Sequence, residues 1–70
     1  MAAMTGTVWR LIPDKGFGFI KRDGDDLSYF FHRSVVVGGT FVNLREGQRV
    51  RFEEEFSSRG PRAGQVVVEP

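Results

Sequence analysis

Two short aromatic segments carry the side chains best suited to bind a ligand. Lys15–Ile20 reads Lys-Gly-Phe-Gly-Phe-Ile, and Tyr29–His32 reads Tyr-Phe-Phe-His. Successive side chains of a β-strand point to opposite faces. A domain this small has one interior, which cannot hold all of these rings, so we expect one set on the surface. Exposed rings with basic neighbours form a stacking platform for unpaired bases. Alternation places Phe17 with Phe19 on one face of their strand, and Phe30 with His32 on one face of theirs.

The length and composition indicate one small domain that spans residues 1–70. Seventy residues lie near the size at which a single core is only just sufficient. The chain has no cysteine, which excludes disulfides and thiolate metal sites. No apolar run is long enough for a signal peptide or a membrane span. We therefore expect a soluble cytoplasmic protein with no membrane partner, and a frayed N-terminal tail over residues 1–4.

The charge of the chain is almost balanced. Ten Lys and Arg against nine Asp and Glu give a net charge of +1, which is far from the strongly basic balance of a duplex-DNA binder. Counterion release alone therefore cannot supply high affinity for nucleic acid, and stacking must provide much of the energy.

The hydrophobic pattern predicts an all-β fold. No segment has a sustained helical period, and nine glycines and three prolines interrupt the chain. Five short strands without a helix indicate a small closed antiparallel barrel. We expect a mobile loop over Ser57–Pro61, a short helical turn near Ser34, and a core led by Val8, Ile20, Phe31, Val50, Phe52 and Val66. The predicted strands are Gly6–Leu11, Gly16–Arg22, Ser28–His32, Arg49–Glu55 and Gly64–Glu69.

In their order along the chain, these segments resemble the bacterial cold-shock proteins. The two aromatic segments are similar to the two ribonucleoprotein motifs of that family, and Gly6-Thr7-Val8, Leu44–Val50 and Arg59–Ala63 extend the resemblance over nearly the whole chain. The resemblance implies a five-stranded oligonucleotide/oligosaccharide-binding (OB-fold) barrel. It also implies binding of single-stranded RNA and DNA with low sequence specificity, and RNA chaperone activity.

The resemblance assigns a role to each site residue. Phe17, Phe19 and Phe30 would form the centre of the platform, with His32 extending it and Phe41 adding a ring from the long loop. Basic side chains would contact phosphates and hold the strand in register. The resemblance implies that Lys15 and Arg59 would make these phosphate contacts.

The chain departs from the family pattern at four positions. The family usually has lysine, tryptophan and phenylalanine after its first valine, whereas this chain has Trp9, Arg10 and Leu11. Arg10 can stack on a base and attract phosphate. Trp9 either flanks the binding face or packs against the barrel edge. Arg33 replaces an aromatic residue, so more arginines and fewer rings predict a steeper salt dependence of binding.

Catalysis and metal binding are poorly supported. His32 is the single histidine, no cysteine is present, and no carboxylate lies near it in the predicted strand. We therefore expect no enzymatic activity, cofactor, metal or small-molecule substrate. Glu53–Glu55 is expected to be a solvated strand end, or to repel nucleic acid from the wrong side of the barrel.

Two further alternatives remain open from the sequence. The same aromatic face could grip a peptide or protein partner, because small barrels host many functions. Lys15 and Arg59 beside the rings favour phosphates over an apolar peptide. We expect a monomer, with a strand-swapped dimer as the alternative.

Overall fold

The computed structural model describes residues 3–24, 27–37 and 44–69 of the chain. These residues form strands joined by tight turns, which confirms the prediction of an all-β fold. No helix in the described ranges is long and apolar enough to cross a membrane. In chain order the elements are β1 (Ala3–Ile12), β2 (Phe17–Arg22), β3 (Ser28–His32), the 3₁₀ turn η1 (Arg33–Val35), β4 (Val36–Val37), β5 (Arg49–Ser57) and β6 (Gly60–Val68).

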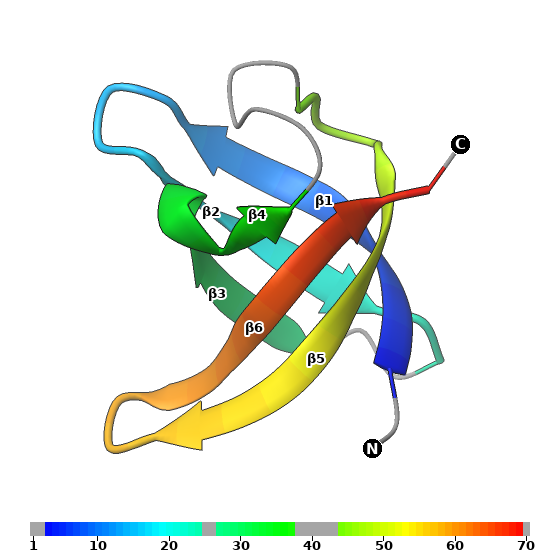
Figure 1. Cartoon of the computed structure of the whole chain (residues 1–70), viewed down its shortest axis with the longest axis vertical. Coiled ribbons are helices and arrows are strands. Elements are labelled where there is room, and N and C mark those ends of the chain that lie inside the picture. The colour runs from blue at the N-terminus through cyan, green and yellow to red at the C-terminus, as the bar shows by residue number, and fades with distance from the viewer. Residues whose placement is uncertain (1–2, 25–26, 38–43, 70) are drawn as a thin grey trace.

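The five long strands close into a barrel (Figure 1). Neighbouring strands follow the order β3-β2-β1-β5-β6, with the short β4 beside β6, and β3 also pairs with β6. This closing pair is parallel and joins Phe30 to Arg62, so the predicted barrel is not wholly antiparallel. The reason is geometric. Strand direction alternates from each neighbour to the next, so a ring of five strands must contain one parallel pair.

Parts of two segments that we predicted to be irregular belong to strands, while residues 1–2 of the predicted tail lie outside the described residues. β1 begins at Ala3, and the supposed tail residues Ala3 and Met4 pair with Glu53 and Phe52 of β5. Met4 is half-buried and packs on the core, which explains why this end is held. The predicted loop Ser57–Pro61 is the end of a hairpin.

The hairpin turn between β5 and β6 is held by its own polar groups. The chain reverses at Ser58 and Arg59, and Gly60 supplies the positive φ of 115° that this reversal needs. The Ser57 hydroxyl accepts a hydrogen bond from the Arg59 N–H at 3.2 Å and donates one to the Gly60 carbonyl at 3.1 Å. The two strands can therefore extend to the turn itself.

The barrel interior holds the core that the sequence predicted. All six predicted core side chains, Val8, Ile20, Phe31, Val50, Phe52 and Val66, are at most 1% exposed. Tyr29, Leu44 and Ala63 are buried with them. Tyr29 is fully buried because its hydroxyl finds partners: it donates to the Glu54 carboxylate and accepts from Arg22 Nη1 at 3.0 Å. We had expected Glu54 to belong to a solvated strand end, and the structure corrects this expectation.

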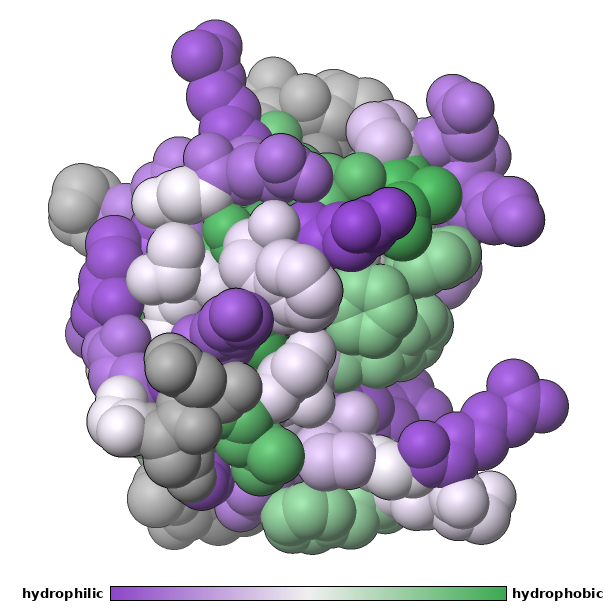
Figure 2. Space-filling view, turned by 180° about the vertical axis from the view of Figure 1, so that it is seen from behind, coloured by the Kyte–Doolittle hydropathy of each residue, from purple (hydrophilic) through white to green (hydrophobic). Residues whose placement is uncertain are grey.

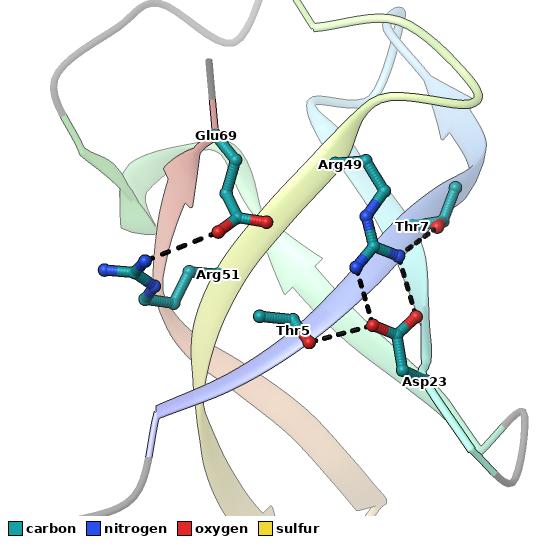
Figure 3. Close-up of polar contacts among 6 residues, drawn as sticks. All are labelled: Thr5, Thr7, Asp23, Arg49, Arg51 and Glu69. Atoms are coloured by element: carbon teal, nitrogen blue, oxygen red, sulfur yellow. Dashed lines mark hydrogen bonds and ion pairs between the residues drawn. The ribbon is translucent and has the colours of Figure 1, made fainter.

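An ion pair outside the barrel ties the turn after β2 to β1 and β5 (Figure 3). The Arg49 guanidinium donates to both carboxylate oxygens of Asp23, at 2.7 and 2.6 Å, and also to Thr7 Oγ1 at 3.1 Å. Thr5 Oγ1 donates to the same carboxylate at 2.8 Å. The hydrogen bonds from Arg49 and then Thr5 lower the pKa of Asp23 to about 2.

The depressed pKa of Asp23 predicts a loss of stability in acid. The carboxylate stabilises the fold above its unfolded pKa of about 3.9, and this contribution disappears as the pH falls towards 2. Asp23→Asn should lower stability at neutral pH and flatten the dependence between about pH 5 and pH 2, as measured by urea unfolding. Asp14→Asn is the matched control, since Asp14 forms no ion pair within the described ranges. If the unfolding free energy of Asp23→Asn depends on pH as steeply as that of the wild type, Asp23 is not the source of this pH dependence.

Close packing across β1 and β2 predicts the effect of a methyl group at Gly18. A Cβ at this position would lie 2.7 Å from the Arg10 carbonyl oxygen and 2.9 Å from the Phe31 ring. We expect Gly18→Ala to lower the free energy of unfolding by about 1–3 kcal/mol in urea. If Gly18 faced open space, the same substitution would raise the free energy of unfolding by about 0.4–1 kcal/mol. A measured increase in this free energy would therefore contradict the close packing at Gly18.

Candidate nucleic-acid interface

Three phenylalanine rings gather on the outer face of β2 and β3. Phe19 pairs with Phe30, and Phe17 pairs with His32 on the neighbouring strand. Directly opposed residues share a face, so these side chains lie together. The residues between them, such as Gly18 and Phe31, are buried. Alternation therefore separates core from surface as predicted.

The three rings, which we call the platform (Phe17, Phe19 and Phe30), form a compact triangle. Their centroids lie 5.4 to 5.9 Å apart, with interplanar angles of 38°, 71° and 88°. Each ring is half-buried rather than enclosed. Figure 2 shows apolar side chains gathered on the right of the rear face, with a hollow below them. Rings fixed by one another in this way offer surface to a base without losing much side-chain entropy.

A β-bulge in β1 brings Trp9 to the platform. The register shifts between Val8 and Arg10, so Trp9 is the extra residue, and Arg10 pairs with Phe19. The Trp9 ring is 42% exposed and lies 6.2 Å from the Phe19 ring at an angle of 44°. Of the two predicted positions for Trp9, the structure shows the one that flanks the aromatic face.

Two residues that we did not predict fix the Trp9 ring. Its Nε1–H donates to Ser28 Oγ at 3.3 Å, and Lys21 Nζ lies 4.8 Å from the ring centroid. Lys21 pairs with both Thr7 and Ser28, which places a polar row directly beside the platform. Alternation places Lys21 on the same face as Phe19, and this signal could have identified Lys21 from the sequence.

His32 and Arg33 lie at the end of β3, beside Phe17. His32 is exposed, and its Nδ1 accepts the Ser34 N–H at 3.1 Å and lies 2.9 Å from Ser34 Oγ. This ring therefore caps the turn η1, which leaves Nε2 as the nitrogen available to a ligand. The Arg33 side chain covers Gly16, where a Cβ would lie 3.0 Å from Arg33 Cδ.

The remaining predicted cations lie in turns. Lys15 is exposed in the turn that leads into β2, and Arg59 is exposed at the tip of the β5–β6 hairpin. Arg59 lies beside a cavity of about 540 Å³ between the hairpin and the platform. The predicted Phe41 lies outside the described residues. The cavity is lined by Phe19, Phe30, Ser57, Ser58, Arg59, Gly60, Pro61 and Arg62.

The described residues contain no cluster that could hold a metal ion. Within residues 3–24, 27–37 and 44–69, no three His, Cys, Asp or Glu side chains come together in this way. The face instead combines flat apolar rings with guanidinium and ammonium groups. This chemistry suits a ligand that has both aromatic bases and phosphates.

Comparisons with known proteins agree on one family. Residues 4–69 match the profile described as the 'Cold-shock' DNA-binding domain. The chain is 49% identical over 63 residues to Cold shock protein 1 of Lactiplantibacillus plantarum, which covers 89% of this chain and 92% of that protein. It is 44% identical over 65 residues to Cold shock-like protein CspA of Vibrio cholerae, which covers 93% of each.

A solved structure supports the fold independently. The chain is similar to Drosophila Unr CSD456 with a TM-score of 0.81 at 23% sequence identity. The match covers 99% of this chain and 27% of the longer one. At this level of identity the likeness concerns the fold alone.

The alternation of rings predicts opposite responses for two adjacent phenylalanines. Phe31→Ala removes a fully buried ring, and we expect it to cost about 3–5 kcal/mol of unfolding free energy. Phe30→Ala removes a half-buried ring of the platform and should cost much less. Urea unfolding followed by far-UV circular dichroism measures both. Equal losses would mean that Phe30 belongs to the core.

Proposed function

This chain belongs to the 'Cold-shock' DNA-binding domain family, and we propose that it binds single-stranded RNA and DNA through the platform. Bases stack on Phe17, Phe19 and Phe30. Trp9 extends the stacking surface from β2 onto β1. The observation that carries this proposal is the position of three mutually packed rings outside a barrel whose interior is already filled.

Stacking supplies most of the binding energy in this proposal. Each stacked base contributes about 1–3 kcal/mol by alanine substitution. Three or four rings then outweigh the cost of ordering the strand. Because stacking uses the flat face that every base has, the proposed binding has little sequence preference.

The distribution of ion pairs supports a phosphate-binding role for the cations beside the rings. Among the described residues, the arginines with carboxylate partners are Arg22, Arg49, Arg51 and Arg62. Arg10, Lys15 and Arg59 form no ion pair with any residue in those ranges, whereas Arg62 is paired although it lies next to Phe30. A nearly neutral chain can therefore present local positive charge where a strand would run.

The proposed activity in the cell is that of an RNA chaperone in the cytoplasm. Stacking on the protein competes with stacking inside RNA hairpins, so transient single strands are trapped and later released. This competition needs no nucleotide hydrolysis, and no catalytic step is involved. His32 acts in this scheme as a capping residue of η1 that also borders the platform.

The first test is anisotropy of labelled heptathymidine titrated with the protein at low and moderate salt. Binding should be tight for the single strand, weak for a duplex of equal length, and weaker at higher salt, because cations beside the rings release counterions. Trp9 fluorescence should be quenched in the same titration. A folded protein that binds neither probe would contradict the proposal and direct the search to protein partners.

Removal of single rings tests the platform itself. Phe17→Ala or Phe30→Ala should weaken binding of heptathymidine by about 1–3 kcal/mol while the barrel remains folded. Phe56→Ala is the matched control, since the Phe56 ring is 70% exposed on β5 and does not line the cavity beside the platform. If the control weakens binding as much as the platform variants, general apolar contact rather than the platform explains the affinity.

A further inference from the structure

The row of residues that contains the platform continues across the closing strands of the barrel. Phe30 of β3 pairs with Arg62 of β6, and Arg62 pairs with Glu55 of β5. Opposed residues share a face, so Arg62 and Glu55 lie on the same outer surface as Phe19 and Phe30. Arg62 is thus the cation directly beside the platform ring on β3.

The Arg62 side chain is incompletely satisfied. Its Nε atom is buried and makes no hydrogen bond to any described residue. Glu55 Oε1 is 3.4 Å from this Nε, within ion-pair distance, while the two side chains remain 43% and 50% exposed. Arg62 also lines the cavity between the hairpin and the platform, together with Phe19 and Phe30. A guanidinium donor therefore borders a cavity large enough for part of a nucleotide.

Glu55 is held close to Arg62 by the shape of β6. Gly64, two residues further along that strand, has no side chain, and a Cβ there would lie 2.5 Å from Glu55 Oε2. The missing side chain leaves room for the Glu55 carboxylate against the strand. A carboxylate and a phosphate offer the same paired oxygens to a guanidinium, so only one of them can use this donor set fully.

We propose that Arg62 binds a backbone phosphate of the strand stacked on Phe30, and that Glu55 competes with this phosphate and lowers the affinity. The inference rests on the proposed function, since it concerns the same surface. Half-exposed ion pairs are weak, so a phosphate can displace the carboxylate. Glu55 therefore acts as a built-in competitor that keeps release of the strand fast.

Neutralising Glu55 tests the competition. Glu55→Gln keeps the size of the side chain and removes its charge, and we expect heptathymidine to bind about threefold more tightly by anisotropy at low salt. Glu53→Gln is the matched control on the same strand. It removes the same charge from a residue that pairs with Ala3 and lies away from the cavity. The control should change affinity less than the test variant.

A double-mutant cycle separates competition from general repulsion. Arg62→Gln should weaken binding by about threefold to tenfold. It should also reduce the slope of log affinity against log salt concentration by about one, the change expected for the loss of one phosphate contact. In the Arg62→Gln background, Glu55→Gln should bring no gain beyond that of Glu53→Gln. If Arg62→Gln unfolds, as judged by circular dichroism, Arg62→Met replaces it, because this change also removes the charge and keeps an unbranched apolar stem.

Two results would overturn the inference. A gain from Glu55→Gln that persists without Arg62 means that Glu55 acts by general repulsion. Equal affinities of wild type, Glu55→Gln and Glu53→Gln mean that Glu55 does not compete at all. Either result leaves the proposed function intact, because the wild-type protein still binds the single strand. Failure of the folded wild type to bind would reject both the proposed function and this inference.

Discussion

The filled interior of the barrel determines where the other aromatic side chains lie. Tyr29, Phe31 and Phe52 together with six smaller side chains occupy the core, and all nine are at most 6% exposed. Side chains alternate along β2 and β3, so each ring that enters the core places its neighbours outside. The platform is therefore a direct consequence of core packing in strands this rich in phenylalanine. The same strands supply both stability and the proposed binding surface.

The features that could be predicted from the sequence are those that depend on neighbouring residues. Alternation places the core and the platform, and turn residues place β2 and β3 almost to the residue. The features that could not be predicted depend on partners far along the chain. β1 extends to Ala3 because β5 lies beside it, and Glu54 is half-buried because Tyr29 needs a partner. The bulge at Trp9 likewise arises from the pairing of two strands, which periodicity within one strand does not report.

The positions of the ion pairs, rather than the net charge of the chain, determine where its surface is positively charged. Asp23 holds Arg49 at one side of the barrel, and Glu54 holds Arg22 beside the buried tyrosine. These acidic groups stabilise the fold while they neutralise cations away from the platform. Hence a net charge of +1 conceals an uneven surface. Under the proposed function, such a distribution would limit non-specific attachment to duplexes and other polyanions.

The extra residue in β1 also has a consequence for how such sequences can vary. In a regular strand, exchanging two adjacent residues would move one of them from surface to interior. At the bulge, Trp9 and Arg10 both lie on the outside, next to the same ring of β2. An aromatic residue and a basic residue can therefore trade places here while the surface keeps one of each. Position-by-position comparison counts two differences, whereas the composition of the surface is unchanged.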